Sequence, residues 1–356
     1  MSMKKNTLYA VEGLPLIQNR VHPDRASAEA CETGDIRLTQ DLKTGLIYNQ
    51  AFEESRVIYD GNYQNEQANS SFFCRHLHEI AHLLETHMSD ASLIEVGCGK
   101  GVFLESMAQR GFAITGMDPA YEGENSAIRK EFFDEHSGIT GDGIILRHVL
   151  EHISDPITFL QRIRDANGGK GLIYIEVPCF DWIVANHTWY DIFYEHVNYF
   201  RLSDFDRTFG RLVHAERSFG GQYLSVIGDL STLQIPQAIS EDEIDFPGDF
   251  FSGIEACASR ITERAKSGVQ TFVWGGSSKG VIFSIYMRRA GVQIAGVVDI
   301  NPAKQNQYLS VSGQRVMKPV EAMQQFPEGS DVIVMNPNYL SEIRELTEAR
   351  FNYLTI

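Results

Sequence analysis

The residues with the clearest chemical meaning surround a glycine-rich turn that follows an apolar run. Residues 93–101 read as a short strand that carries an acid near its end and then enters three alternate glycines. Glycine tolerates positive φ and has no Cβ, so such a turn lets a ligand approach backbone N–H groups closely. A second apolar run, 112–118, ends in an aspartate, near where a doubly wound sheet places a ribose-binding acid. The pattern predicts a nucleotide-binding turn rather than a plain tight connection, with the candidate residues Glu95, Gly97, Gly99, Gly101 and Asp118.

Two later clusters carry imidazoles. One follows the apolar run 143–146 and contains His148 and His152, and the other follows the run 171–177 and contains Glu195 and His196. Ligands gather at the carboxyl ends of strands in open α/β sheets, so these polar groups are expected to face a cleft. Imidazole titrates near neutrality, so either His152 or His196 could remove a proton from a methyl acceptor. The competing interpretation is an aromatic cluster that closes the core around a satisfied histidine.

Two other turns contain adjacent glycines and could let a ligand approach the backbone. Gly220-Gly221 precedes Gln222 and an apolar run, which indicates either close approach of a substrate or a bulge. A second strand and glycine turn spans residues 271–280 and contains Lys279, which could hold a phosphate or a sugar diphosphate. A packing or capping role for this second turn is equally open.

The elements that must position these residues alternate between helix and strand. Apolar residues at helical spacing predict a helix over 71–87, and strand-like runs at 143–146 and 171–177 flank a helix over 156–167. This order predicts an α/β fold with a parallel sheet, and the runs 212–219 and 223–229 would complete it. The same order of strand, glycine turn, helix and strand repeats after an acidic stretch with two prolines. The predicted organisation is a small irregular lobe (1–70), a Rossmann-like core (71–230), an acidic linker (231–250) and a second Rossmann-like domain (251–356).

Composition excludes several classes of protein. The chain has 356 residues, is 43% hydrophobic and 22% charged, and carries a formal charge of −16, which is ordinary for a globular protein and unfavourable for binding nucleic acid. Its apolar runs are strand-sized and its first residues do not continue into a signal-peptide core, so we expect a cytoplasmic protein without a membrane span. The five cysteines form no Cys-x-x-Cys pair, and the histidines of the 71–87 helix scatter over its faces, so no metal is predicted.

The first turn resembles the S-adenosylmethionine (SAM) site of class I methyltransferases. An acid-x-Gly-x-Gly-x-Gly turn followed by a strand that ends in Asp is typical of that family, and the Gly-x-Gly-x-x-Gly spacing of dinucleotide sites is missing. The resemblance implies SAM as cofactor and S-adenosylhomocysteine as product. It also implies that the turn meets the methionine part of SAM and that Asp118 holds the ribose, and we add His148 to the candidate cofactor contacts.

Most of the chain is also similar to the sugar C-methyltransferases that act on nucleotide-linked 4-keto sugars. That family combines a small N-terminal zinc lobe, a class I methyltransferase core and a C-terminal Rossmann-like domain. The similarity rests on these matches: Leu150-Glu151-His152-Ile153, Glu195-His196 with Tyr199-Phe200, Gly220-Gly221, Trp274-Gly275, Lys279-Gly280, Asp299 to Gln305 and Asn336 to Ile343. It implies the catalytic residues His196, Glu195, His152 and Tyr194, and the substrate contacts Tyr63, Asn65, Tyr199, Gly221, Gln222 and Lys279.

Three departures from that family concern the metal and the acceptor. The zinc lobe's Cys pairs are replaced by Asp41 to Gly45, so the lobe must be held by packing. Phe193 stands where the family has a catalytic tyrosine, with Tyr194 beside it, and Asn65 replaces a second tyrosine.

The leading hypothesis is SAM-dependent methylation of a sugar or nucleotide-linked sugar, with a His general base. The alternatives are O- or N-methylation of another polar small molecule, and a SAM-binding protein without catalysis.

Overall fold

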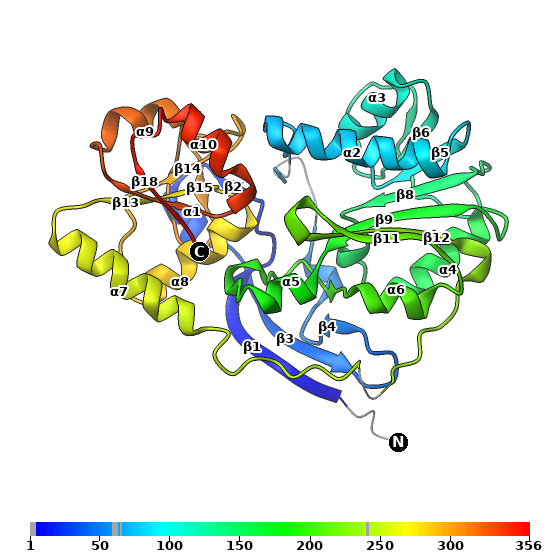
Figure 1. The fold of residues 1–356 in the computed structure, drawn as a ribbon, viewed down its shortest axis with the longest axis horizontal. Coiled ribbons are helices and arrows are strands. Elements are labelled where there is room, and N and C mark those ends of the chain that lie inside the picture. Colours follow the sequence, from blue (N-terminus) through cyan, green and yellow to red (C-terminus); the bar gives the residue numbers. More distant parts are fainter. Residues whose placement is uncertain (1–4, 59–62, 65, 240–241) are drawn as a thin grey trace.

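The computed structural model of the chain describes residues 5–58, 63–64, 66–239 and 242–356. Figure 1 shows two α/β units side by side, with the strands of the N-terminal segment curving beneath them. The first unit contains the glycine turn at Gly97 and the second contains the turn at Gly275. The α/β class and the repeated Rossmann-like plan that the sequence predicts are therefore confirmed.

The first unit is a seven-stranded sheet in the order β11-β12-β9-β8-β5-β6-β7. Strands β7, β6, β5, β8 and β9 pair in parallel, whereas β12 runs antiparallel to both of its neighbours. This is the strand arrangement of class I methyltransferases that the resemblance implied. The strands are β5 (Ser92–Val96), β6 (Ala113–Met117), β7 (Ile128–Arg129), β8 (Gly143–Arg147), β9 (Leu172–Pro178), β11 (Leu212–Ser218) and β12 (Tyr223–Asp229).

Helices cover both faces of this sheet, so its central strands are mostly apolar, with charged residues only near their carboxyl ends. Helices α2 (Ser71–His87) and α3 (Val102–Gln109) pack on one face, where Leu77 and Met107 meet Ile145. Helices α4 (Pro156–Ala166) and α6 (Leu202–Thr208) pack on the other face, where Ile163 and Phe205 meet Ile144. The short helix α5 (Phe180–Ala185) follows β9.

Local signals fix where these helices begin. The hydroxyl of Ser70 accepts a hydrogen bond from the Phe73 N–H at 3.2 Å, and the carboxylate of Asp155 accepts one from the Thr158 N–H at 3.0 Å. Side-chain caps of this kind satisfy N–H groups that have no partner within the helix. Proline follows Asp155 at the first helical position, where its missing N–H costs no hydrogen bond.

The N-terminal segment is more regular than the expected irregular lobe. Strands β1 (Lys5–Pro15), β3 (Thr33–Asp41) and β4 (Ile47–Asn49) form an antiparallel sheet that is completed by β10 (Asn198–Tyr199) of the first unit. Strand β2 (Val21–His22) pairs with β15 (Tyr308–Leu309) of the second unit. The segment also holds α1 (Arg25–Glu29). Because these strands pair with residues far along the chain, their local sequence gives little sign of the sheet, and the segment connects both units.

The second unit is a five-stranded sheet in the order β16-β14-β13-β17-β18, and every neighbouring pair is parallel. In chain order this is 3-2-1-4-5, the doubly wound arrangement with a switch point beside the first strand. The strands are β13 (Thr271–Trp274), β14 (Val297–Val298), β16 (Val316–Met317), β17 (Asp331–Val334) and β18 (Asn352–Thr355), and the helices are α7 (Ser252–Lys266), α8 (Ser278–Arg289), α9 (Pro319–Gln325) and α10 (Leu340–Leu346).

Residues 242–250 of the predicted linker lie against the N-terminal sheet. The Gln40 side chain donates to the Asp242 carbonyl at 2.7 Å and accepts from the Ile244 N–H at 3.0 Å, and Phe250 is fully buried. The predicted linker is thus anchored by packing, while the domain boundaries drawn at 70, 230 and 250 stay predictions.

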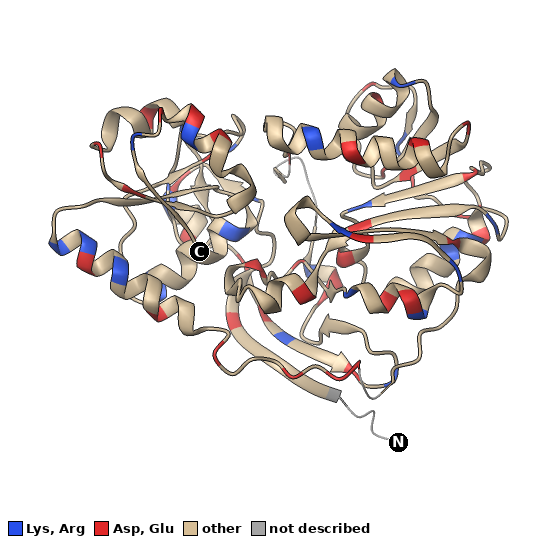
Figure 2. Cartoon of the chain, in the orientation of Figure 1, with Lys and Arg blue, Asp and Glu red and all other residues tan. Residues whose placement is uncertain are grey.

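Acidic and basic residues are spread over both units (Figure 2). Among the residues described, no helix combines the length and apolarity needed to cross a membrane. Short 3-10 helices complete the described secondary structure: η1 (Glu54–Arg56), η2 (Leu150–His152), η3 (Trp189–Asp191), η4 (Phe219–Gly221), η5 (Leu230–Thr232) and η7 (Pro337–Tyr339).

Candidate functional site

The first glycine turn and Asp118 lie together, because they end neighbouring parallel strands, β5 and β6. Gly97, Gly99 and Gly101 have φ angles of 72°, 55° and 82°, and Gly101 is the residue from which α3 begins. The Asp118 carboxylate accepts hydrogen bonds at 2.8 Å from the N–H groups of Gly99 and Ala120. The structure therefore brings the predicted cofactor turn and the predicted ribose acid into direct contact.

Glu95 lies beneath this turn and is 3% exposed. Burial raises its pKa to about 7, Arg147 opposes that rise, and the nearby Asp118 adds to it. Its Oε2 has no hydrogen-bond partner among the described residues. A buried carboxyl oxygen of this kind is suited to receive an N–H donor from a ligand.

His148 is held between two buried acids just after β8. Its Nδ1 lies 3.2 Å from Glu151 Oε1 and its Nε2 lies 3.1 Å from Glu176 Oε1. Burial lowers the pKa of His148, but the hydrogen bonds and charges of these two acids outweigh burial and raise it to about 9. The imidazole is therefore cationic at neutral pH. Its backbone φ of 52° is unusual for a residue with a side chain, as often seen where a ligand is held.

The two candidate bases, His152 and His196, face each other with ring centroids 5.0 Å apart. His152 donates from Nδ1 to the main-chain oxygen of Glu195 at 2.9 Å, which leaves the lone pair on Nε2. Burial, His152 and His148 together lower the pKa of His196 well below its usual value. The lowered pKa keeps the ring of His196 neutral at neutral pH.

Glu195 was expected to support the general base, and it contacts His152 through its main-chain oxygen. Its carboxylate accepts from the Gln18 N–H at 3.1 Å, and its main-chain oxygen holds His152. The contact of Glu195 with a candidate base is thus made through the backbone. It fixes the ring of His152 rather than that of His196.

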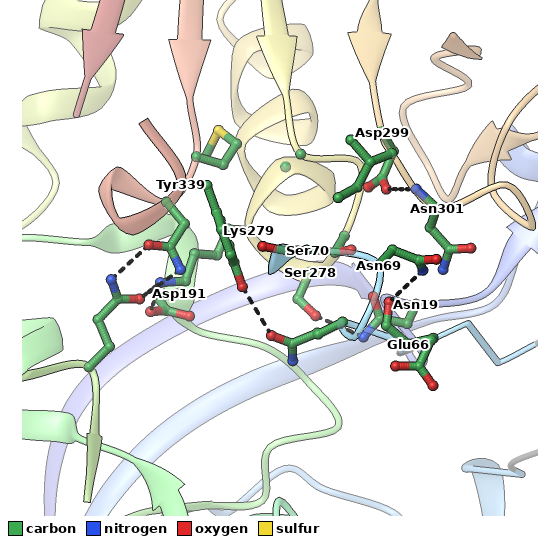
Figure 3. A pocket seen from close by; sticks show the side chains of 18 of the residues that line it. Asn19, Glu66, Asn69, Ser70, Asp191, Ser278, Lys279, Asp299, Asn301 and Tyr339 are labelled. Atoms are coloured by element: carbon green, nitrogen blue, oxygen red, sulfur yellow. Dashed lines mark hydrogen bonds and ion pairs between the residues drawn. The ribbon is translucent and has the colours of Figure 1, made fainter. Parts of the chain in front are cut away.

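One cavity is lined both by these imidazoles and by the second glycine turn. The empty space within it, open mouth included, is about 1310 Å³. Figure 3 shows side chains from the N-terminal segment, the first unit and the second unit directed into this space. The lining includes Asn19, Tyr63, Ser70, His148, Glu151, His152, Asp191, Phe193, His196, Gln222, Ser278, Lys279, Asp299, Asn301, Asn336 and Tyr339.

Three of the predicted substrate contacts line the cavity: Tyr63, Gln222 and Lys279. The Lys279 ammonium lies 2.9 Å from an Asp191 carboxylate oxygen and donates to Gln222 Oε1 at 2.8 Å. It also lies 5.0 Å from the centre of the Trp182 ring. Asn65, another predicted contact, falls outside the described residues.

Other predicted residues lie away from the cavity. Tyr194 is fully buried and its hydroxyl accepts from the Glu53 N–H at 2.9 Å, because Gly34 has no Cβ to occupy the space of its ring. Phe193 lines the cavity in its place.

The hydroxyl of Tyr199 bonds both the N–H and the carbonyl of Phe193, at 2.8 and 3.0 Å, so Tyr199 shapes the loop from beneath. Gly221, with a φ of 85°, packs against Trp182 instead of lining the cavity. We therefore assign none of these three residues to catalysis or to substrate contact.

The sequence analysis assigned no site role to several polar residues around the second turn, although Asp299 and Lys304 lie in one of the family matches. Asp299 follows β14, as Asp118 follows β6, and accepts from the N–H groups of Gly276 and Asn301 at 2.8 Å. Lys304 is 1% exposed and donates to Asn19 Oδ1 at 3.1 Å and to Ser277 Oγ at 2.6 Å. The acid at the end of the second strand was the available signal for Asp299, whereas Asn19 gave none.

Comparisons with known proteins agree with the first unit. Residues 65–212 match the family model described as "Methyltransferase domain". The C-methyltransferase NovU of Streptomyces niveus is 27% identical over 165 residues, which cover 42% of this chain and 39% of that protein. The ubiquinone biosynthesis O-methyltransferase of Aeromonas salmonicida is 29% identical over 98 residues, which cover 23% of this chain and 41% of that protein. The aligned segments thus span about two fifths of these relatives.

Solved structures match over a similar part of the chain. One is the 1,6-didemethyltoxoflavin-N1-methyltransferase of Burkholderia thailandensis with bound 1,6-didemethyltoxoflavin and S-adenosylhomocysteine. It is 17% identical, with a TM-score of 0.35, over 43% of this chain and 77% of that chain. The family match identifies residues 65–212 as a methyltransferase domain, and the strand order is that of the class I fold, for which SAM is the cofactor.

Proposed function

We propose that the protein transfers a methyl group from SAM to a sugar or nucleotide-linked sugar, with His196 or His152 as general base. The observation that carries this proposal is the cavity that joins both imidazoles to the second glycine turn. The donor turn lies beside it, because a Cβ on Gly97 would meet Val149 Cγ2 at 2.5 Å and Val149 adjoins His148. Donor and acceptor would therefore meet at the His148–His152 segment.

The lowered pKa of His196 and the hydrogen bond that orients His152 support a role in proton removal. A general base must be unprotonated at working pH, and the lowered pKa of His196 keeps its ring neutral. The Glu195 carbonyl accepts from Nδ1 of His152, so Nε2 is the ring nitrogen that could take up a proton. Methyl transfer itself needs mainly alignment of the acceptor with the sulfonium carbon, so one oriented base and a shaped cavity suffice.

The polar lining supports an acceptor rich in hydroxyl or phosphate groups. Amide and hydroxyl side chains such as Asn19, Gln222 and Tyr339 offer both donors and acceptors of hydrogen bonds. Lys279 and the N-terminus of the twelve-residue helix α8 add positive potential at the far end of the cavity. A sugar near the imidazoles with an anionic group near Lys279 would satisfy both ends.

The names of the relatives differ in the atom that receives the methyl group. One is named a C-methyltransferase and the other an O-methyltransferase. Phe193 at the cavity wall also supplies no phenol to assist enolate formation at carbon. O- or N-methylation of another polar molecule is therefore the second candidate, and the cytoplasmic location stays a prediction.

The decisive experiment incubates the protein with methyl-labelled SAM and a panel of nucleotide sugars, 4-keto-6-deoxy forms included, in deuterated water. Mass spectrometry then follows methyl gain and deuterium uptake. Methyl gain with ring deuterium indicates carbon methylation through an enolate, and gain without it indicates oxygen or nitrogen. Failure of every member of the panel, with SAM binding intact, would refute the sugar acceptor.

The base is tested by variants in the same assay. His196→Gln and His152→Gln should each keep SAM binding, and at least one should lose about 10²–10⁴-fold in kcat, the usual worth of a general base. His136→Gln is a matched control, because the His136 side chain is 83% exposed. Full activity of both cavity variants would end the His assignment.

A further inference from the structure

Three potential metal ligands converge at the wall of the cavity. Glu151, His152 and His196 each offer one ligand atom, and these atoms all lie within 4.8 Å of one another. They come from two separate segments, η2 after β8 and the loop before β10. Two imidazoles and one carboxylate are the ligands of many open transition-metal sites in proteins. We call these three residues the His₂Glu cluster.

Neighbouring residues hold the side chains of the His₂Glu cluster in the way that metal ligands are usually held. Glu151 is 1% exposed, its Oε1 is 3.2 Å from His148 Nδ1, and its Oε2 has no hydrogen-bond partner among the described residues. His152 donates its Nδ1–H to the Glu195 carbonyl, the arrangement that usually fixes a ligating imidazole. A buried carboxylate oxygen without a partner is costly, and a cation would compensate it.

The third potential ligand of the cluster is His196. Its ring contacts His152, Phe193 and Tyr199, and no hydrogen bond of its side chain occurs in the described part of the chain. Both imidazoles are partly exposed, and all three residues line the cavity. An ion at this position would have protein ligands on one side and open positions toward the cavity.

We propose that the His₂Glu cluster binds a divalent transition-metal ion such as Zn²⁺ or Co²⁺. Imidazole ligands favour these ions over Mg²⁺ and Ca²⁺, which prefer oxygen ligands. This inference rests on the proposed methyl transfer but changes the task of the imidazoles, which would hold the ion. The ion would then bind an acceptor oxygen and lower the pKa of the acceptor group, in place of a histidine base. The sequence analysis predicted no metal, since only the fold brings the two segments together.

The first test measures binding without SAM or acceptor. Protein freed of metal by a chelator is titrated with Zn²⁺ by calorimetry and with Co²⁺ by visible absorption, which reports coordination geometry. We expect one equivalent to bind. Binding should weaken by at least roughly 100-fold in His152→Ala, His196→Ala and Glu151→Gln, given that loss of supporting groups alone weakens metal sites about 10–100-fold. No binding, or equal binding by these variants, overturns the site.

Controls separate metal binding from folding and from the reaction. SAM affinity is measured for each variant, because a folded variant should keep its donor site. His136→Ala, at an exposed histidine, should bind the metal as the unchanged protein does. If metal binds but no acceptor is methylated, the proposed function fails and the site stands. If methyl transfer is undiminished in the metal-free protein, the catalytic role of the ion is refuted.

Discussion

Replacing Gly97 by alanine should damage the protein more than the same change at Gly99. Both residues have positive φ, at 72° and 55°, so both alanines are strained in the backbone. At Gly97 the new Cβ would also meet Val149 Cγ2 at 2.5 Å, whereas nothing lies within 4 Å of a Cβ at Gly99. The two variants therefore differ by one steric clash against a stiff, β-branched side chain.

The magnitudes follow from these two contributions. Left-handed backbone costs a residue with a side chain about 1–2 kcal/mol, and alanine recovers about 0.4–1 kcal/mol by restricting the unfolded chain. Gly99→Ala should therefore lose about 1 kcal/mol of unfolding free energy. Overpacking adds roughly 1–3 kcal/mol at Gly97. Gly101→Ala should fall between them, because its Cβ would meet only the flexible end of Ile128, at 2.5 Å.

Urea unfolding of the ligand-free variants tests this order, with SAM affinity measured by calorimetry afterwards. Val149 lies between His148 and Leu150, so its displacement in Gly97→Ala should also disturb the predicted acceptor site and lower kcat. Equal unfolding midpoints for the Gly97 and Gly99 variants would refute the steric argument. A Gly99 variant less stable than the Gly97 variant would refute it as well.

Three further predictions concern charged groups. Glu176→Gln should lower the unfolding free energy by about 3–5 kcal/mol in urea titrations, because the buried carboxylate pairs with Arg147 and His148; a loss below 1 kcal/mol contradicts this. Because the pKa of His148 is raised from 6.5 to about 9, its stabilisation is full below about pH 6.5 and is lost as pH rises through about 9, so the stability gap between the unchanged protein and His148→Gln should shrink over that range; a constant gap argues otherwise. Lys279→Met should raise KM for an anionic acceptor roughly tenfold or more while SAM affinity is unchanged, as a charged hydrogen bond contributes about 1.5–3 kcal/mol; an unaltered KM excludes Lys279 from acceptor binding.

Strong periodicity made much of the fold predictable. The helix expected over 71–87 is α2 (Ser71–His87), and the run expected over 223–229 is β12 (Tyr223–Asp229). Strand β7 (Ile128–Arg129) has two residues and no periodic pattern, so the sequence could not locate it. The sheet of β1, β3 and β4 is completed by β10, which lies far along the chain, and local sequence carries no record of such pairing.

The site could also be predicted only in part: the positions of its loops could be predicted, but the directions of their side chains could not. Chain order places residues at the carboxyl ends of parallel strands, so the glycine turn, Asp118 and the two imidazole loops could be located from sequence. The direction of a side chain within a loop depends on backbone detail that spacing does not encode. Phe193 and Tyr194 are adjacent, yet Phe193 lines the cavity and Tyr194 lies behind it against Gly34.

The two α/β units are connected by a short piece of the N-terminal segment. The Gln18 N–H binds the carboxylate of Glu195, whose carbonyl holds His152. The next residue, Asn19, donates to Ser278 Oγ at 3.0 Å and accepts from Lys304. One dipeptide therefore contacts both the imidazole loop of the first unit and the glycine turn of the second. If the first unit holds the methyl donor and the second holds the anionic end of the acceptor, as we propose, this dipeptide sets the distance between them, because it cannot move without shifting a hydrogen bond at each end.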